Sequence, residues 1–291
     1  PIEYIEPIKT EVTMPVLTLP TRTVGYADEG VGPPILLVHG SACSRRFWKG
    51  IIPELARNHR VLSVDLHGYG ESSPWPTESI LTPAEEGELI GAIADRAGGP
   101  VTLVGHSYGG ALVAEFAARH PDRVSSLVLI EPSAFNLLRT AGDTAAWAEI
   151  EDLALRHIAL VMHGHLADAA QLFMTYWVGA KAWQAMPEPR RNSIIETMPK
   201  VAAEWRLISF RLRGISIYRQ LKVCTTLICG GETKGPSQRV VELVRAVLPN
   251  AAFAEIAHAG HMAPLTHPAA VLTALAAHFA WCAAETDSRA A

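Results

Sequence analysis

A five-residue turn with the sequence Gly-His-Ser-Tyr-Gly, at 105–109, constrains the fold more than any other part of the chain. The apolar run 101–104 before it has the character of a buried strand, and the stretch 111–119 after it favours a helix. The flanking glycines let strand and helix approach each other without Cβ clashes. Ser107 is therefore predicted at the tip of a sharp strand-to-helix bend. Such a backbone conformation costs roughly 1–3 kcal/mol, and chains usually tolerate it where function depends on it.

Short apolar runs alternate with helix-forming stretches along most of the chain. Strands are predicted at 34–39, 61–65, 101–104, 124–130, 223–229 and 251–256. Helices are predicted at 47–57, 83–97, 111–119, 237–247 and 268–281. The opening segment 11–29 suits an antiparallel hairpin. The order predicts an α/β fold: a mostly parallel eight-stranded sheet with helices on both faces.

From about 133 to 219 the alternation stops. This stretch is rich in helix-forming residues, contains four tryptophans and has no convincing strand. It is therefore predicted to be a helical insertion between two strands, with the α/β core formed by 1–132 and 220–291. The tryptophans are Trp147, Trp177, Trp183 and Trp205.

Composition excludes several classes of partner. The net charge of −4 and the absence of a basic cluster argue against a nucleic-acid or anionic-membrane surface. No run of 18 apolar residues predicts a membrane span, and the first residues do not have the pattern of a signal peptide. The 4 cysteines are irregularly spaced, so free thiols and a cytoplasmic location are expected. The oligomeric state is left open.

The bend predicts nucleophilic chemistry, but a serine hydroxyl needs an adjacent base that an acid orients. In this architecture the order along the chain is serine, carboxylate, histidine. His261 is the preferred base because it follows the last predicted strand and Gly260 gives the backbone freedom for a turn. His258 is its rival, whereas His267 fits the start of a helix better.

Two backbone N–H groups should hold the negative oxygen that forms during such chemistry. One belongs to Tyr108, the residue after the nucleophile. The other is expected from Ser41, because His39-Gly40-Ser41 lets the chain turn back toward the serine.

These residues carry a resemblance. The chain is similar to the α/β-hydrolase fold superfamily over nearly its full length, through five short segments. They are His39-Gly40, 65–72, 105–110, 122–132 and Gly260-His261 with His267-Pro268. The resemblance implies that the insertion at 133–219 is a lid. Asp65, at the end of a predicted strand, is interpreted as shaping its glycine-containing loop.

The chain departs from the superfamily at the acid. Relatives most often carry an aspartate shortly after the seventh strand, but here that position falls on Thr233 or Lys234. Glu232 is a carboxylate, but it lies one residue before the expected position. Glu131 ends the sixth strand, where some members, including certain dehalogenases, carry their acid. Glu131 is preferred and Glu232 is kept as the alternative.

The sequence thus predicts a serine hydrolase that cleaves a carboxylic ester with a small or medium, fairly apolar acyl part. Ser107 attacks, His261 accepts its proton, Glu131 orients the imidazole, and no cofactor or metal is required. A serine at 107 argues against epoxide hydrolase and dehalogenase chemistry, which need a carboxylate nucleophile. Carbon–carbon bond hydrolysis, lactone hydrolysis, cofactor-free peroxidation and a non-catalytic ligand-binding role remain as alternatives.

Three further patterns have plainer interpretations. Phe173, Tyr176 and Trp177 either line an acyl pocket or form the core of the insertion itself. The pair His163 and His165 has no third residue at metal-ligand spacing, so a metal site is not expected. The acidic residues Glu85, Glu86 and Glu88 are predicted to lie on a solvated helix face.

Overall fold

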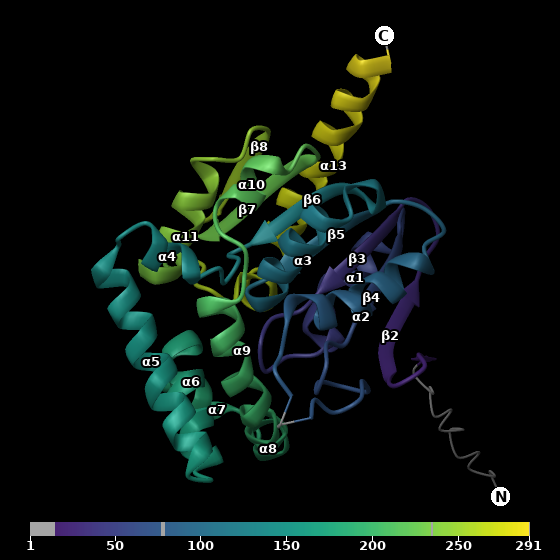
Figure 1. The fold of residues 1–291 in the computed structure, drawn as a ribbon. Coiled ribbons are helices and arrows are strands. Elements are labelled where there is room, and N and C mark those ends of the chain that lie inside the picture. The colour runs from purple at the N-terminus through teal and green to yellow at the C-terminus, as the bar shows by residue number, and fades with distance from the viewer. Residues whose placement is uncertain (1–14, 77–78, 234, 291) are drawn as a thin grey trace, which may run out of the picture.

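The computed structural model describes residues 15–76, 79–233 and 235–290 and contains one eight-stranded sheet (Figure 1). The strands are β1 (Val16–Thr18), β2 (Thr23–Glu29), β3 (Pro34–Val38), β4 (Arg60–Val64), β5 (Val101–His106), β6 (Val124–Ile130), β7 (Cys224–Gly230) and β8 (Ala251–Ile256). Their order in the sheet is β1-β2-β4-β3-β5-β6-β7-β8. The first two strands pair antiparallel and the rest run parallel, which confirms the predicted fold class. Residues 11–14 of the predicted hairpin lie outside the described residues.

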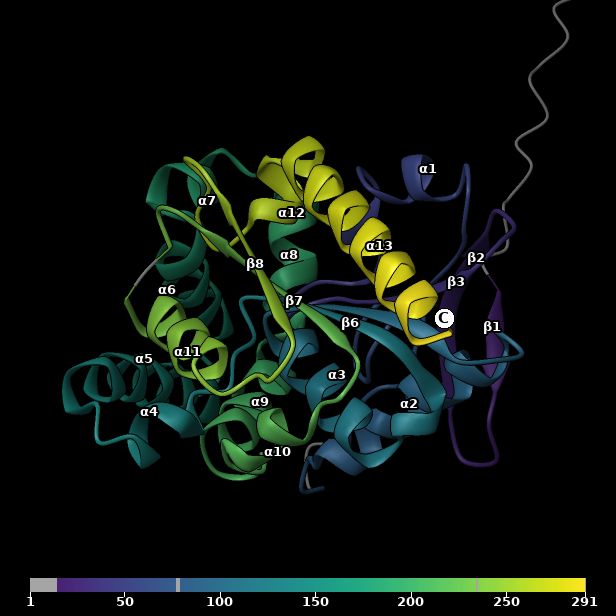
Figure 2. The ribbon, with the colours of Figure 1, turned by 90° about the horizontal axis from the view of Figure 1, so that it is seen from above.

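Helices cover both faces of the sheet, as Figure 2 shows from above. One face is covered by α1 (Ile52–Leu55), α12 (Ala263–Thr266) and α13 (Pro268–Ala290). The other is covered by α2 (Pro83–Asp95), α3 (Tyr108–Arg119) and α11 (Gly235–Arg245). Burial on both faces explains why β3, β5 and β6 read as continuous apolar runs instead of alternating ones.

The helix predicted at 47–57 is wrong in extent. The chain forms a 3-10 helix, Arg45–Trp48, and then the short α1. Pro53 lies in the first turn of α1, where its missing N–H costs nothing, but it could not continue a helix begun at residue 47. The apolar residues of this stretch still pack against the sheet.

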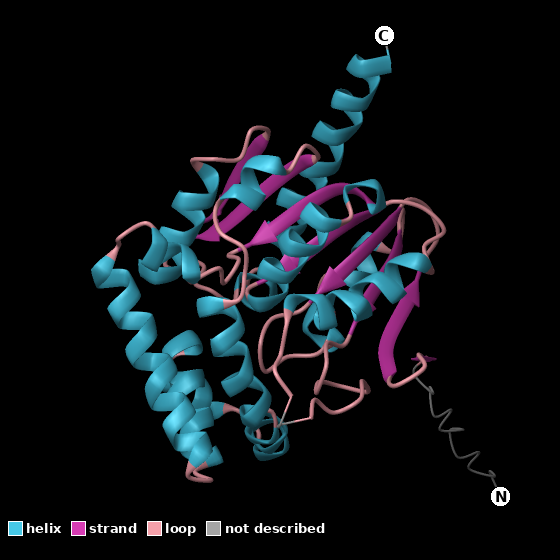
Figure 3. Cartoon of the chain, viewed as in Figure 1, coloured by secondary structure: helices cyan, strands magenta, loops and turns pink. Residues whose placement is uncertain are grey.

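The stretch between β6 and β7 is helical, as Figure 3 shows. The structure describes every residue of this stretch, and none of them is in a strand. It contains α4 (Asn136–Thr140), α5 (Thr144–Met162), α6 (Leu166–Val178), α7 (Ala180–Ala185), α8 (Glu188–Glu196), α9 (Met198–Phe210) and α10 (Ser216–Gln220). We call these seven elements the helical insertion. In Figure 1, α9 lies between the outer helices α5 and α6 and the core, and it contacts both α5 and α3.

One helix, α13, is long and apolar enough over Pro268–Glu285 to cross a bilayer on length and composition alone. Its residues Val271 and Leu275 are fully buried and pack against the sheet with Ile228 and Ile256. Of the Pro268–Glu285 stretch, 22% is buried, and a single helix that meets this criterion in the described part of the chain is weak evidence for a membrane span.

Candidate active site

Ser107 occupies the sharp bend between β5 and α3, with φ 54° and ψ −118°. Glycine is required on both sides of it. A Cβ on Gly105 would lie 2.5 Å from the carbonyl oxygen of Gly109, and a Cβ on Gly109 would lie 2.4 Å from that of His39. The close approach of strand, helix and neighbouring loop therefore explains the two glycines of the turn.

The structure joins Ser107, His261 and Glu131 in one hydrogen-bonded chain. His261 follows β8, and its Nε2 lies 2.9 Å from Ser107 Oγ. Its Nδ1 lies 2.6 Å from Glu131 Oε2. Because the carboxylate can only accept, Nδ1 carries the proton and Nε2 accepts from the serine hydroxyl. Ser107 and Glu131, which are 154 and 130 positions from His261 in sequence, meet it at the carboxyl ends of parallel strands.

Glu131 is fully buried and held on both sides. Its Oε1 accepts from the backbone N–H of Gly230 at 2.7 Å and from the Thr233 hydroxyl at 2.6 Å. Burial raises the pKa of Glu131, but the hydrogen bonds from His261, Thr233 and Gly230 outweigh it and hold the pKa below its usual value. Thr233, one of the two residues at which an acid is expected from the resemblance, thus supports the Glu131 carboxylate at the end of β6.

His258 and Glu232, the alternatives predicted for the base and the acid, lie outside this hydrogen-bonded chain. The side chains of His258 and Glu232 are 89% and 67% exposed, and they face each other at 3.6 Å. Instead, His261 contacts Ser107, and Glu131 contacts His261. The backbone carbonyl of His261 also accepts from His106 Nε2 at 2.8 Å, which fixes the loop that carries the imidazole.

The two predicted oxyanion donors lie beside the serine. Tyr108 is the first residue of α3, where a helix leaves its N–H groups without an intrahelical acceptor. Ser41 lines the cavities next to Ser107, and Gly40 before it approaches so closely that an added Cβ would lie 3.0 Å from Ser107 Cβ.

Two small cavities meet at Ser107, Ser41, Phe173 and Trp177. The first, of about 120 Å³, contains His261 and extends toward α8, and we call it the histidine-side cavity. The second, of about 10 Å³, lies away from His261, and we call it the inner cavity. Its walls are mostly apolar: Phe135, Phe173, Trp177, Val201, Trp205 and Ile208. The ring of Trp177 also covers the imidazole of His261, at a centroid distance of 4.3 Å.

Of the three predicted pocket aromatics, Phe173 and Trp177 reach these cavities, whereas Tyr176 does not. Tyr176 lines an outer groove between α5 and α6 and donates to Glu149 Oε1 at 2.6 Å. Adjacent helix residues point about 100° apart, so Tyr176 cannot share the direction of Trp177.

Two features near Ser107 are not predicted from the sequence. The Ser133 hydroxyl lies 3.0 Å from Ser107 Oγ, and no motif signals it. Lys200 of α9 is buried between two carboxylates, with Nζ 2.6 Å from Glu86 and 2.8 Å from Glu204. The prediction of a solvated face at Glu85, Glu86 and Glu88 is therefore wrong for Glu86, which is fully buried because Lys200 descends from the helical insertion to meet it.

This cluster continues to Tyr69 in the loop after β4 and to Tyr108, the first residue of α3. The Tyr108 hydroxyl donates to Glu86 at 3.1 Å, and the Tyr69 hydroxyl donates to Glu204 at 2.7 Å. Burial lowers the pKa of Lys200, but attraction to Glu204 and Glu86 outweighs it and raises that pKa. Burial raises the pKa of Glu86, but attraction to Lys200 and the hydrogen bonds it accepts outweigh it and lower that pKa. For Glu204, burial prevails and the pKa is raised.

Other candidates have structural explanations. Asp65 is buried and holds its loop together, since it pairs with Arg45 and accepts from the backbone N–H of Glu71 at 3.0 Å. His163 and His165 are exposed, and no group of three potential metal ligands exists among the described residues.

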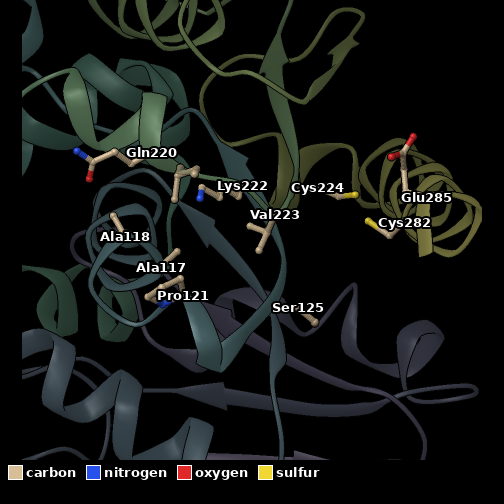
Figure 4. A pocket seen from close by; sticks show the side chains of 11 residues that line it. Ala117, Ala118, Pro121, Ser125, Gln220, Lys222, Val223, Cys224, Cys282 and Glu285 are labelled. Atoms are coloured by element: carbon tan, nitrogen blue, oxygen red, sulfur yellow. The ribbon is translucent and has the colours of Figure 1, made fainter. Parts of the chain in front are cut away.

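A hollow of about 480 Å³ lies by the amino end of β7, lined by Cys224, Cys282 and Lys222 among others (Figure 4). The hydrogen-bonded chain from Ser107 to Glu131 lies at the opposite, carboxyl ends of the strands. The hollow is therefore separate from the candidate active site.

The strand order and the sharp bend at Ser107 define an α/β hydrolase, and the similarity of the chain to known proteins agrees with this. The chain belongs to the alpha/beta hydrolase fold family, whose sequence profile matches residues 33–268. It is 31% identical to a 2-hydroxymuconate semialdehyde hydrolase of Pseudomonas sp. (strain CF600) over 123 residues, 41% of this chain and 44% of that one. It is 27% identical to a pimeloyl-[acyl-carrier protein] methyl ester esterase of Aliivibrio salmonicida (strain LFI1238) over 180 residues, 62% of each chain. The matches thus span less than two thirds of these relatives.

Among solved structures, the enol-lactonase of Burkholderia xenovorans LB400 is similar, with a TM-score of 0.73 and 19% identity. The similarity covers 91% of this chain and 100% of that one. At this identity the likeness establishes the fold alone.

Proposed function

We propose that this α/β hydrolase is a serine hydrolase that cleaves carboxylic esters with a small acyl group through an acyl-enzyme. The observation that carries the proposal is the hydrogen-bonded chain from Ser107 through His261 to Glu131. A serine hydroxyl next to a neutral imidazole, itself oriented by a buried carboxylate, has the arrangement needed for nucleophilic attack on a carbonyl.

The proposed reaction follows from the positions of the groups. Ser107 Oγ attacks the ester carbonyl as its proton passes to His261 Nε2, and Glu131 stabilises the imidazolium. The N–H groups of Ser41 and Tyr108 bind the developing oxyanion, and each such donor is typically worth about 2.7–4 kcal/mol of the barrier. The imidazolium then protonates the leaving alkoxide, and water activated by the same imidazole releases the acid.

Each of the two cavities suits one half of the proposed ester. The leaving alcohol must depart beside His261, which protonates it, so the histidine-side cavity is its site. At about 120 Å³ it is slightly smaller than the roughly 150 Å³ cavity that holds benzene in an engineered protein. The acyl group then enters the inner cavity, whose volume of about 10 Å³ holds roughly one water molecule. A short acyl chain with apolar walls around it is the proposed preference.

The helical insertion supplies a cover for the site, so we propose that it acts as a lid. Phe173 and Trp177 of α6 close the cavities above Ser107, and Trp177 shields the imidazole from water. Exclusion of water strengthens the electrostatic contacts on which the reaction depends. The contact of Glu131 with His261 weighs against a non-catalytic ligand-binding protein, whose main support is the missing carboxylate at 233 or 234.

The test is hydrolysis of p-nitrophenyl acetate and p-nitrophenyl butyrate by the wild type and by Ser107→Ala. The proposal expects turnover by the wild type, faster with acetate, and a loss of at least about a thousandfold in the variant. Equal, slow rates for the two proteins, together with tight binding of a small molecule by the wild type, would instead support the ligand-binding alternative.

A further inference from the structure

The inner cavity contains one ionisable group among its apolar walls, the carboxyl of Glu204. This residue lies on α9 of the helical insertion and is 1% exposed. It lines the cavity together with Ser41 and Ser107, so it lies beside the proposed reaction centre, in the cavity that His261 does not line. The proposed ester hydrolysis does not use it.

The two oxygens of Glu204 differ in their surroundings. Oε1 accepts from Lys200 Nζ at 2.8 Å and from the Tyr69 hydroxyl at 2.7 Å. Oε2 is buried and has no well-formed hydrogen bond to any residue that the structure describes. Burial raises the pKa of the carboxyl, and this outweighs the lowering by Lys200 and, to a smaller extent, by the side chains of Ser41 and Tyr69. A buried carboxyl oxygen without a partner costs about 1–3 kcal/mol, so its retention points to a partner that comes with the ligand.

The rest of the cluster fixes this carboxyl in place. Lys200 holds Glu204 and Glu86 together, and Glu86 accepts from Tyr108, the residue after the nucleophile. Glu204 therefore cannot turn away to solvent without breaking two hydrogen bonds and leaving the Lys200 charge less well paired. It is a preorganised polar group in the wall of a mostly apolar cavity.

We propose that Glu204 recognises a hydroxyl group on the acyl part of the substrate, so that the preferred esters are those of short hydroxyacids. This inference rests on the proposed function. A hydroxyl suits the site because it can donate to a carboxylate or accept from a neutral carboxyl. An ammonium group suits it less, because Lys200 already places a positive charge 2.8 Å from Glu204.

The inner cavity also limits where such a hydroxyl can be. With space for about one water molecule beyond the serine, the acyl group carries very few atoms. Glycolate and propionate esters form a suitable pair because they have the same number of non-hydrogen atoms and differ by a hydroxyl in place of a methyl.

The experiment measures kcat/KM for butyl glycolate and butyl propionate with the wild type, Glu204→Leu and Glu86→Gln, by titration of the released acid. The ratio of the two constants is taken within one preparation, so it does not depend on how much of the variant is folded. Differences in intrinsic ester reactivity cancel when ratios of different proteins are compared.

We expect the glycolate-to-propionate ratio to fall roughly 10- to 100-fold in Glu204→Leu, the usual effect of one hydrogen bond to a charged group. In Glu86→Gln, which alters the same cluster outside the cavity, both constants should change together and the ratio should stay within about twofold of the wild type. Glu204→Gln, which keeps a hydrogen-bonding group, should give an intermediate ratio.

An unchanged ratio in Glu204→Leu would overturn this inference while leaving the ester hydrolase intact. Failure of the wild type to hydrolyse either ester would overturn the proposed function and this inference with it. A ratio that falls as far in Glu86→Gln as in Glu204→Leu would show that the cluster acts through general packing, and it too would overturn the inference.

Discussion

Replacement of Glu131 by glutamine tests how the acid orients the base. In the wild type, Glu131 Oε1 accepts two hydrogen bonds, from the Gly230 N–H and the Thr233 hydroxyl. In Glu131→Gln the amide oxygen should take that place, because the amide nitrogen cannot accept from either donor. The NH2 group then faces His261 Nδ1 and donates to it. This favours the tautomer with the proton on Nε2, which cannot accept a proton from Ser107.

The expected loss is large because two effects combine. The substitution removes the charge that stabilises the imidazolium across a 2.6 Å contact, and it favours the inactive tautomer. The analogous aspartate-to-asparagine change in a serine protease lowers kcat about 10⁴-fold, which corresponds to about 5.4 kcal/mol. A loss of about 10³- to 10⁴-fold in kcat is expected here with p-nitrophenyl acetate, and KM should change little.

Glu232→Gln is the matched control, since Glu232 is the nearby exposed glutamate that pairs with His258. Its rate should stay within about twofold of the wild type, because surface pairs contribute little. If Glu131→Gln kept more than a tenth of the wild-type kcat, or if Glu232→Gln lost more than Glu131→Gln, the assignment of the acid would be wrong.

Three further predictions concern the lysine cluster, the cavity wall and the dependence of stability on pH. Lys200→Met leaves two carboxylates buried without their cation, so the melting temperature should fall by roughly 10 °C. Replacing Lys200 and both carboxylates by apolar residues should restore most of the lost melting temperature. A drop of under about 2 °C in Lys200→Met would contradict the stabilising role of the cluster. Trp177→Ala opens both cavities, so kcat/KM for p-nitrophenyl hexanoate relative to acetate should rise about tenfold, whereas Tyr176→Phe, outside the cavities, should leave that ratio unchanged. Hydrogen bonds outweigh burial and hold the pKa of Glu131 below its ordinary 4.5, so this carboxylate stabilises the fold above about pH 4.5, and the contribution is lost as the pH falls further. The free energy of unfolding, measured with urea, should therefore decrease less steeply on acidification in Glu131→Gln than in the wild type. Parallel plots of that free energy against pH would refute the shift.

Much of the core could be predicted because its signals are local. The glycines at 105 and 109 and the apolar run before them are contiguous, and backbone sterics alone place Ser107 at a bend. Six of the eight strands follow from short apolar runs, and the first two from the hairpin predicted at 11–29. The helix at 47–57 failed because one proline in the middle of an apolar stretch decides where a helix can begin.

The surroundings of the serine could not be read in the same way. Lys200 and Glu86 are 114 residues apart, and each looks like an ordinary surface charge in its own helix. Their burial depends on how α9 docks against the core, which no local pattern encodes. The choice between Glu131 and Glu232 likewise depends on where a side chain points at the end of a strand, and the supporting hydroxyl of Thr233 becomes visible only in three dimensions.

The most direct test of the account is to label the protein with a fluorophosphonate and map the modified residue by peptide mass spectrometry. Such probes form a stable bond with a serine oxygen that a neighbouring base activates. Peptide fragmentation must separate Ser107 from Ser133, whose hydroxyl lies 3.0 Å away. The account predicts one adduct, on Ser107, formed far more slowly in His261→Ala. No adduct on the folded wild type, or an adduct on Ser133 instead, would contradict it.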